Sequence, residues 1–364
     1  MIRRIFASRQ IALYLSKLFV FRCFAVLAAL IFILQTLDML GESGRILAVK
    51  GNGQAELFHY VLLRTPQLTA RFLPFAVLLG VLITLSTLNQ NSEIISMKAA
   101  GISAHQILMP LIASCFVIAC VSFVFNDRIV TRATARLDAW QAVDYGHPPP
   151  AATSGVNIWV RDGDRLIHVS NVQGYGDKIR LSDITVYHRI NKTLVSILSA
   201  DDGVWTGHGW HLNHVKYFDV AKDSVTEKAV YDINTDLPPE RFTLADVKAE
   251  EKEVIPLYQA IRSLDAAGRP TDELKAGLLH RFTGAFAVIL MPILGSVAGF
   301  GLARSGKLFV RIVIGMSLGF AYFVADNFAL AMGNLGTYPP LLAACAPFVL
   351  FFLIGEAVLV RTEE

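Results

Sequence analysis

Long apolar runs occupy both ends of the chain and leave its middle polar. Each run is close to the roughly 20 residues that an α-helix needs to cross the hydrocarbon core of a bilayer. The pattern predicts six membrane-spanning helices, three on each side of the polar middle: Leu18–Leu40, Phe72–Leu88, Ile107–Phe125, Leu278–Leu302, Leu308–Met332 and Leu341–Val360. Proline residues lie in or near four of these runs, where neighbouring helices can satisfy the freed backbone groups.

From Val156 to Val220 apolar and polar residues alternate, as in half-buried strands. The alternation is clearest in the segments VNIWV, RLIHV, ITVYH and WHLNHVKYF. Clusters of turn-forming residues separate the segments at Asp162–Asp164, Gln173–Asp177 and Asp201–Gly203. Several short strands with regular turns predict an all-β domain of the sandwich or barrel type.

A charged segment, Thr243–Pro270, follows the strands and predicts a linker with a short helix, after which Thr271 can cap the fourth span. We therefore divide the chain into three parts. Spans one to three with a short polar loop fill residues 1–126, the β domain with its linker fills 127–275, and spans four to six fill 276–364.

Composition and charge agree with a membrane protein. The chain has 364 residues, of which 54% are hydrophobic and 17% charged, whereas soluble domains have about 25% charged residues. Lys and Arg residues mark cytoplasmic loops, and they gather near the N-terminus and between spans four and five, at Arg304, Lys307 and Arg311. Both termini are expected in the cytoplasm and the β domain on the outer side. The first run is too long for a cleaved signal peptide and has no small-residue cleavage site.

One short stretch, GLARSGKL at Gly301–Leu308, matches most of the phosphate-binding loop pattern. That loop needs a strand before it, a helix after it and a Ser or Thr directly after the lysine. Here Leu308 follows Lys307 and both flanks are predicted membrane helices. We interpret the stretch as a cytoplasmic turn, so any ATP that drives this protein is expected to bind to a partner.

The loop between spans two and three, residues 91–103, has the pattern of a short helix. Ser92 can cap the helix and Gly101 can end it. Glu93 and Lys98 are its only formal charges. Such a helix on the cytoplasmic face suits the docking of a motor subunit, and the alternative is an ordinary interfacial turn.

A basic stripe follows span three, where Arg128, Arg132 and Arg136 are spaced four residues apart and would share one helix face. Arginine binds phosphate with two-pronged geometry, so an anionic ligand or lipid head group is one reading. The alternative interpretation is that the arginine side chains extend to the membrane–water interface or pair with Asp127 and Asp138.

Few other residues suggest chemistry. Asp326 lies inside span five, where a carboxylate usually faces a cavity or a partner. The glycines of GSVAG (Gly295, Gly299) and GMSLG (Gly315, Gly319) would permit close helix packing. On a regular strand, His208 and His214 would face away from His211, so solvated histidines are a better reading than zinc ligands. No nucleophile elbow, zinc-protease motif or catalytic carboxylate pair occurs, which leaves an enzyme reading without a site, and no cofactor is expected.

Three stretches in this order resemble the lipopolysaccharide export permease family, the LptF/LptG type, over essentially the whole chain. The first is PQLTARFLPFAVLLGVLITLSTLNQNSEIISMKAAGIS, the second comprises WVRDGDRLIHV, LSDITVYHRI and VWTGHGWHL, and the third is FGLARSGKLFVRIVIGMSLGFAYFVADNFA followed by LGTYPPLLAACAP. The Arg-Ser pair after Gly301 and the region of Asp326 are more similar to the LptG branch than to the LptF branch.

This resemblance implies a transport subunit of the bacterial inner membrane with a periplasmic β domain of the jellyroll-like kind. It implies an ABC transporter in which an LptF-type permease pairs with this chain and an LptB-type ATPase dimer powers the complex. An LptC-type single-span membrane protein and an LptA-type periplasmic bridge complete the path of lipopolysaccharide to the outer membrane. Glu93 matches the glutamate of the family's coupling helix, and Arg132 and Arg136 match basic residues at the cavity mouth.

The resemblance also implies a lipid gate lined by spans one and five. Helix spacing then gives candidate lipid-contacting residues, for each of which ordinary packing is the alternative: Phe24, Leu27, Ile31, Leu34 and Gln35 in span one, and Phe320, Phe323, Asp326 and Phe328 in span five. The family leads us to expect Lys or Arg near the end of span one, but this chain has Gln35, Asp38, Gly41 and Glu42 there. A scaffold that an ATPase moves without passing any substrate, and a lipid-modifying enzyme, are the competing hypotheses.

Overall fold

The computed structural model describes residues 8–146, 153–173, 179–190, 193–207, 209–234, 242, 248–266, 270–299 and 308–363. The chain forms two compact units, which are described one at a time. The helical unit comprises Met1–Gly44, Gln54–Thr134 and Ala249–Glu364, and the second unit comprises Arg45–Gly53 and Ala135–Lys248. Of the segment 127–275, expected to hold the β domain and its helical linker, residues 135–248 belong to the second unit, and residues 127–134 and 249–275 belong to the helical unit.

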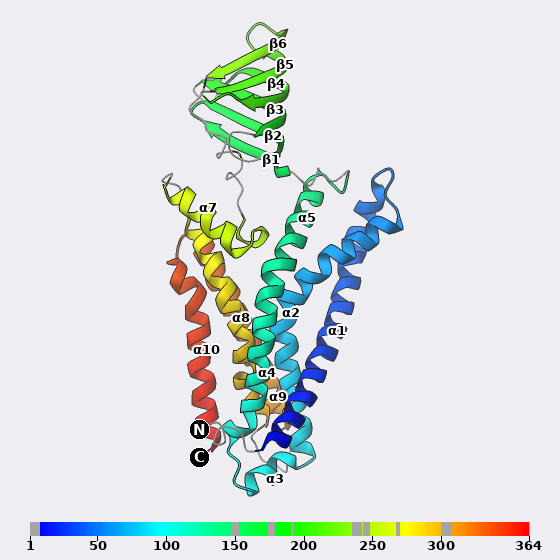
Figure 1. Ribbon diagram of the computed structural model, residues 1–364, viewed down its shortest axis with the longest axis vertical. Helices are drawn as coiled ribbons and strands as arrows, with labels where there is room; N and C mark the ends of the chain where they lie inside the picture. The colour runs from blue at the N-terminus through cyan, green and yellow to red at the C-terminus, as the bar shows by residue number, and fades with distance from the viewer. Residues whose placement is uncertain are drawn as a thin grey trace. The chain divides into compact units, whose positions relative to one another are not determined.

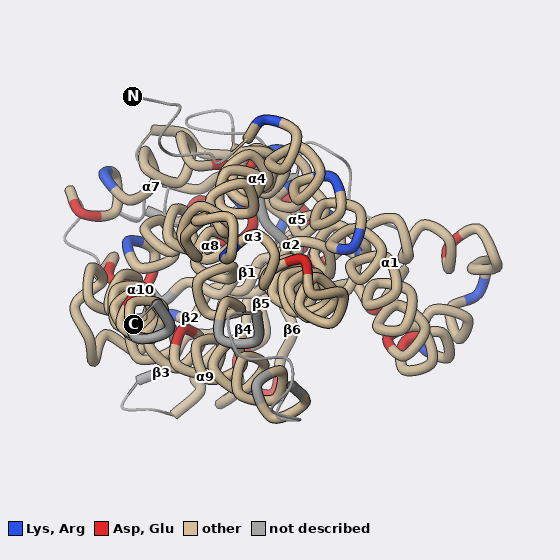
Figure 2. Tube along the Cα trace, turned by 90° about the horizontal axis from the view of Figure 1, so that it is seen from below, with Lys and Arg blue, Asp and Glu red and all other residues tan. Residues whose placement is uncertain are grey.

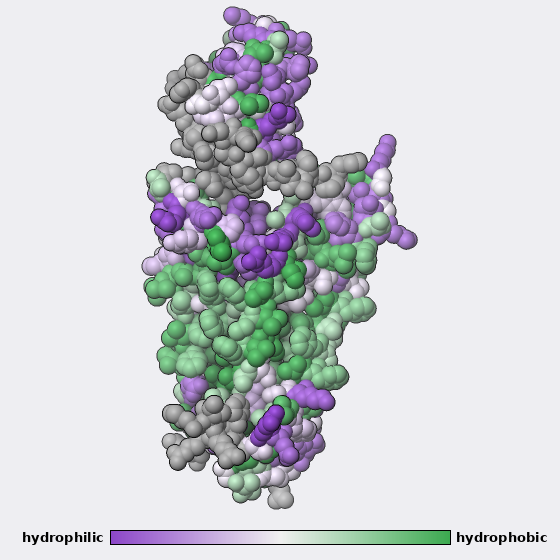
Figure 3. Space-filling view, viewed as in Figure 1, coloured by the Kyte–Doolittle hydropathy of each residue, from purple (hydrophilic) through white to green (hydrophobic). Residues whose placement is uncertain are grey.

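Six helices in the described part of the chain are long and apolar enough to cross a membrane, which confirms the six predicted spans. They are α1 (Arg9–Ala48), α2 (Gln54–Gln90), α4 (Ala104–Phe125), α8 (Asp272–Gly299), α9 (Leu308–Asn334) and α10 (Pro340–Glu363). Most extend beyond the apolar runs because their polar ends continue the same helix. Green apolar side chains cover the middle of these helices in Figure 3, while the Lys, Arg, Asp and Glu positions marked in Figure 2 are sparse along them.

Helix α4 does not stop at the end of its apolar run. It continues through one π-helical turn, η2 (Asn126–Val130), into α5 (Thr131–Ala142). Short helices complete the set: α3 (Glu93–Ala99), η4 (Ala249–Glu251) and α7 (Val254–Ala266). The predicted linker helix is α7, and Asp127 holds its start, because one carboxylate oxygen accepts from the Val254 amide at 2.7 Å and from Arg281 Nη1 at 3.3 Å.

Glycines let α2 pack closely against α8 and α9, as predicted for three of them. A Cβ atom would lie 2.1 Å from Leu78 Cδ2 if it were added at Gly319, and 2.7 Å from Val81 Cγ1 if added at Gly295. At Gly315 it would lie 2.8 Å from Leu82 Cδ2. Real Cβ atoms do not approach carbon so closely, so these side chains of α2 occupy space that only glycine leaves open.

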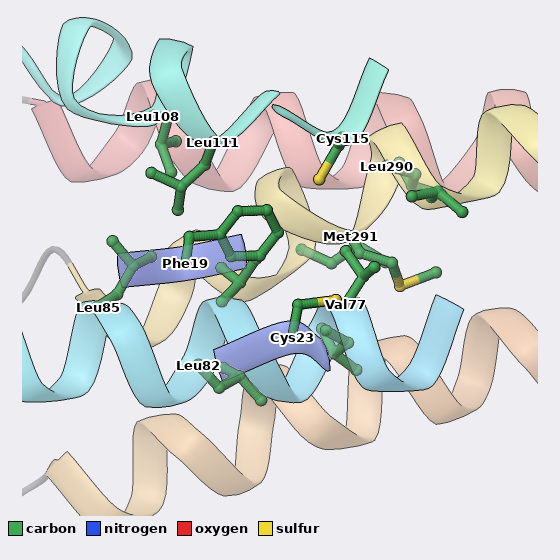
Figure 4. Close-up of a cluster of buried hydrophobic side chains, with 14 of the residues drawn as sticks. Phe19, Cys23, Val77, Leu82, Leu85, Leu108, Leu111, Cys115, Leu290 and Met291 are labelled. Atoms are coloured by element: carbon green, nitrogen blue, oxygen red, sulfur yellow. The ribbon is translucent and has the colours of Figure 1, made fainter. Parts of the chain in front are cut away.

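A stripe of buried side chains packs helix α1 against the bundle. Leu15, Phe19 and Cys23 are fully buried, and Figure 4 shows Phe19 and Cys23 among residues of α2, α4 and α8. The two backbones approach closely where Gly80 of α2 meets Cys23, because a Cβ on Gly80 would lie 3.0 Å from the Cys23 Cα.

The second unit contains one six-stranded antiparallel sheet with the order β1-β2-β3-β4-β5-β6. The strands are β1 (Thr153–Asp162), β2 (Arg165–Gln173), β3 (Arg180–Ile190), β4 (Thr193–Trp205), β5 (Gly209–Asp219) and β6 (Ser224–Asn234). The all-β domain is confirmed, and its order is that of a meander (Figure 1). Its core uses the alternate residues of each strand, such as Ile167, Val169 and Leu212.

The turn signals were only partly correct. Asp162–Asp164 does form the hairpin between β1 and β2, with Gly163 at a positive φ of 56°. The turn predicted at Asp201–Gly203 is wrong, because these residues lie inside β4. Gly203 serves packing there: a Cβ on it would lie 2.7 Å from both Ile184 and Leu212. Of the turn predicted at Gln173–Asp177, Gln173 ends β2, and residues 174–177 lie outside the described residues.

Candidate functional site

The loop between α2 and α4 forms the short helix α3, but Ser92 does not cap it. Ser92 has a positive φ of 61° and its side chain makes no capping hydrogen bond. A left-handed residue turns the chain sharply at this point, which carries the hydroxyl away from the first amides of α3. The serine that caps a helix in this loop is Ser103, which forms a capping box with Gln106 at the start of α4.

Gly101 ends α3 as predicted. With its φ of +83°, it allows its own amide to donate to the Lys98 carbonyl at 2.9 Å and the Ile102 amide to donate to the Met97 carbonyl at 3.1 Å. This pair of hydrogen bonds is a Schellman motif. Ile94 is buried beneath the helix, while Ile95 and Lys98 are exposed. The helix is therefore fixed at its C-terminal end and along one face, and presents the other face outward.

Glu93, at the first position of α3, is half-buried and connects the helix to α1. The Tyr14 hydroxyl and the Asn91 side-chain amide both donate to Glu93 Oε1 at 3.4 Å. These are long hydrogen bonds, so they orient the carboxylate without neutralising it. Helix α3 lies at the same end of the bundle as the end of α10 (Figure 1), where His105 of α4 lies 3.9 Å from Glu356.

The three arginines of the basic stripe have different surroundings. Glu253, just before α7, accepts from Arg132 Nη2 at 2.8 Å and lies 3.5 Å from Arg128 Nη1. Arg136 is exposed and has no hydrogen bond or ion pair within the described part of the chain. The π-helical turn also interrupts the regular spacing of the stripe. Of the two carboxylates considered earlier as partners, Asp127 lies 3.9 Å from Arg128 Nε, whereas Asp138 pairs with Lys248 at 3.4 Å.

The acidic end of span one has a basic partner on span two. Arg64 of α2 donates from Nε and Nη2 to the two carboxylate oxygens of Asp38, at 3.0 and 3.1 Å. The Tyr60 hydroxyl donates to Asp38 at 2.6 Å, and Arg64 continues to Gln67 and through it to Thr134. Asp38 thus neutralises Arg64 and joins α1 to α2, a pairing that no short-range pattern signals.

Replacing Arg64 by alanine should destabilise the protein, because among the described residues the Asp38 carboxylate would keep only Tyr60 as partner. The pair is largely but not wholly buried, so we expect a loss of about 1–3 kcal/mol, between the values for exposed and buried pairs. Thermal unfolding in mild detergent measures it. Lys216→Ala, which breaks an exposed pair with Glu227, is the control and should change little. Equal stability of Arg64→Ala and wild type would show that the pair is dispensable.

The candidate lipid-contacting residues fall into exposed and buried groups. Phe24, Phe320 and Phe328 are 54%, 60% and 58% exposed. Ile31, Leu34 and Phe323 are half-buried, and the Phe323 ring meets Phe75 of α2 edge-on at 4.7 Å.

Three candidates are buried within the single chain, and their contact with lipid stays a prediction. Leu27 is 6% exposed, while Gln35 and Asp326 are each 9% exposed. Leu27 and Gln35 fall on the four-residue spacing of Leu15, Phe19 and Cys23, so they continue the packing stripe of α1. Asp326 lies on the inner face of α9, where its carboxylate is 3.7 Å from His280 of α8.

Helices α2 and α9 border an apolar groove of about 410 Å³. Phe75, Leu78 and Leu79 line it from α2, and Val313, Met316, Ser317 and Phe320 line it from α9. An apolar, open groove of this volume can hold a length of hydrocarbon chain.

The strand histidines do not converge on one point. His211 Nδ1 lies 2.6 Å from Asp232 of β6, and His214 Nδ1 lies 3.6 Å from Asp201 of β4. The expected alternation between these two is wrong: His214 has a positive φ of 51°, and the inward-facing positions change there from Leu212 to Val215, while the pairing of β5 with β6 continues without a shift. Both are at least partly exposed while Leu212 and Val215 point to the core. His208 and the stretch 301–307 lie outside the described residues.

Comparison with known proteins places these features in one family. A family model described as "Lipopolysaccharide export system permease LptF/LptG" matches residues 13–361. The lipopolysaccharide export system permease protein LptG of Escherichia coli K12 is 24% identical over 311 residues, covering 83% of this chain and 84% of that protein. LptG of Haemophilus influenzae is 23% identical over 329 residues, covering 86% and 89%.

Proposed function

Because this chain belongs to the lipopolysaccharide export permease family LptF/LptG, we propose that it is a permease subunit that extracts lipopolysaccharide from the inner membrane and is powered by a separate ATPase. The family match from residue 13 to residue 361 is the observation on which the proposal mainly rests. Six apolar helices with an inserted antiparallel sheet agree with it. The chain is a transport subunit and not an enzyme.

We assign the docking of the ATPase to α3. A short helix with an exposed face and one acidic group at its start can bind the ATPase and pass its movement on to the membrane-spanning helices. In this arrangement α3 and both termini of the protein would lie in the cytoplasm, and the sheet would lie in the periplasm. The partners of the proposal are an LptB-type ATPase dimer, an LptF-type permease, an LptC-type single-span protein and an LptA-type bridge.

We assign lipid contact to the exposed members of the candidate set. Phe320 lines the groove beside α2. The side chains of Phe24 on α1 and Phe328 on α9 are exposed on the outer surface of the single chain. A lipid with several acyl chains needs such apolar walls and a polar site for its phosphates. Arg136 suits the phosphates because, in contrast to Arg128 and Arg132, no carboxylate of the described chain neutralises it.

Reversing the charge of Arg136 should weaken lipid capture. The variant Arg136→Glu loses one charge-assisted hydrogen bond to phosphate, and we expect about tenfold less bound lipopolysaccharide after purification in gentle detergent. Association with the ATPase should be unchanged. Arg132→Gln is the matched control: Glu253 already neutralises Arg132, so capture should stay near the wild-type level.

The two variants also separate the alternatives. Normal capture by Arg136→Glu would leave this arginine with a topological role only. A wild-type complex that retains its ATPase but never co-purifies with lipopolysaccharide would favour the scaffold hypothesis, in which ATP moves the protein without moving a substrate.

A further inference from the structure

Two polar side chains extend the walls of the apolar groove between α2 and α9. On α2, Arg71 lies one turn before Phe75 and two turns before Leu78, so it shares the helix face that lines the groove. On α9, Asn327 lies two turns after the groove residue Phe320, again on the lining face. Both polar side chains are exposed. Each helix thus adds one polar residue to its groove-lining face.

The packing of the two antiparallel helices brings these residues to the same level. Gly319 of α9 packs against Leu78 of α2. One turn further along α9, the Phe323 ring contacts the Phe75 ring of α2 at 4.7 Å. Each turn forward on α9 therefore meets one turn back on α2. The next turn brings the two polar residues opposite each other, so both lie at one end of the groove.

Arg71 is a charged residue inside a membrane-spanning helix. It lies seven residues beyond Arg64 along α2, which places it roughly 10 Å deeper in the bundle than the ion pair of Arg64 with Asp38. A guanidinium keeps its charge and is costly in lipid, so an arginine at such a position faces an anion or a polar cavity. Within the described part of the chain Arg71 has no ion pair, whereas Asp38 neutralises Arg64. The described residues do not supply the anion, and the groove can hold one that carries a hydrocarbon chain.

Asn327 adds a second hydrogen-bond donor with a fixed direction. Its side-chain nitrogen donates one hydrogen to the Phe323 carbonyl at 2.8 Å, which orients the amide group. The other hydrogen on that nitrogen can donate to a ligand. A phosphate group suits this donor set, because it accepts two parallel hydrogen bonds from an arginine and has further oxygens for the amide.

We propose that Arg71 and Asn327 bind a phosphate group of the lipid whose acyl chain lies in the apolar groove. Under the proposed function, on which this step rests, that lipid is lipopolysaccharide. The family leads us to expect Lys or Arg near the end of span one, where this chain has Asp38, and Asp38 pairs with Arg64. The phosphate contact of the helical unit therefore lies on α2 and α9 and not on α1. Arg136 belongs to the second unit and is a separate contact.

Photocrosslinking in phosphatidylcholine nanodiscs tests this contact. A photoreactive amino acid replaces Ser317, which lines the groove from α9, in the chain assembled with an LptF-type permease and the ATPase. Separate samples contain lipopolysaccharide, the same lipopolysaccharide after chemical removal of its phosphates, or phosphatidic acid. The yield of crosslinked lipid is measured for each.

Arg71→Ala should capture about tenfold less lipopolysaccharide than the wild type, because it loses a two-pronged, charge-assisted contact. Arg71→Lys should lie between the two, since lysine keeps the charge but not the fork. With the dephosphorylated lipid, the wild type and Arg71→Ala should give the same yield. Arg262→Ala is the matched control: Arg262 of α7 is also exposed and does not line the groove, so its loss should leave every yield unchanged.

A wild-type yield of lipopolysaccharide in Arg71→Ala would overturn this inference and leave the proposed function intact. An equal loss with phosphorylated and dephosphorylated lipid would also overturn it, because the side chain would then shape the groove without contacting phosphate. Capture of phosphatidic acid that depends on Arg71, in a complex that captures no lipopolysaccharide, would support the phosphate site and overturn the proposed function instead.

Discussion

Replacing Glu93 by lysine is expected to release the ATPase from the purified complex and to stop export while the chain stays folded. Within the described residues the carboxylate accepts two long hydrogen bonds, from Tyr14 and Asn91, so its loss costs little stability. An interface that recognises it would lose a close charge pair and gain a repulsive one. Such pairs contribute about 1.5–7 kcal/mol at protein interfaces, so ATPase association should fall at least tenfold.

A gentle-detergent pull-down of the tagged chain measures this loss. Tyr14→Phe is the matched control, because it removes the hydroxyl from Glu93 and keeps the charge. It should retain the ATPase if the charge matters, and lose it if the contact between α1 and α3 matters. Unaltered ATPase association in Glu93→Lys would refute the docking role of α3.

Placing a leucine at Gly80 should detach α1 from the bundle. The new side chain would meet the Cα and backbone nitrogen of Cys23, at 3.0 and 3.2 Å from its Cβ. A flexible side chain could move aside, but the backbone of α1 can do so only if the whole helix shifts. Overpacking costs about 1–3 kcal/mol, and here it acts where the backbones of α1 and α2 approach closely.

Thiol labelling of Cys23, read by peptide mass spectrometry, reports the shift because Cys23 is fully buried in the wild type. Gly80→Leu should expose it and lower the unfolding temperature. Gly41→Leu is the control on α1: nothing lies within 4 Å of a Cβ there, and removing a helical glycine stabilises by roughly 0.5–1 kcal/mol. Protection of Cys23 in Gly80→Leu would show that α1 is held elsewhere.

The sequence was sufficient for features that depend on local pattern. Hydropathy located all six spans, and the glycines at positions 295, 315 and 319 pointed to close packing. The end of α3 followed from Gly101, whose missing side chain permits the left-handed turn. Each of these outcomes depends on the residue itself or on its near neighbours along the chain.

Pairings between distant residues were not predictable in the same way. Glu253 reaches Arg132 across 121 positions, and Arg64 reaches Asp38 across 26. The partner of Asp326 is on another helix, so its inward orientation could not be read from span five alone. The turn predicted at Asp201–Gly203 failed because packing of Gly203 between Ile184 and Leu212 overrides the local preference of these residues for turns.

The central claim is that lipopolysaccharide passes along the exposed face of α9. It is tested most directly by a photoreactive amino acid at position 320 in proteoliposomes that contain the chain, an LptF-type permease, the ATPase and a periplasmic acceptor. The control position for the photoreactive residue is Val121 of α4, which is 64% exposed but does not line the groove. The account predicts that position 320 captures lipopolysaccharide and that ATP lowers this yield, while position 121 captures phospholipid whether or not ATP is present. Equal labelling at both positions, unchanged by ATP, would contradict it.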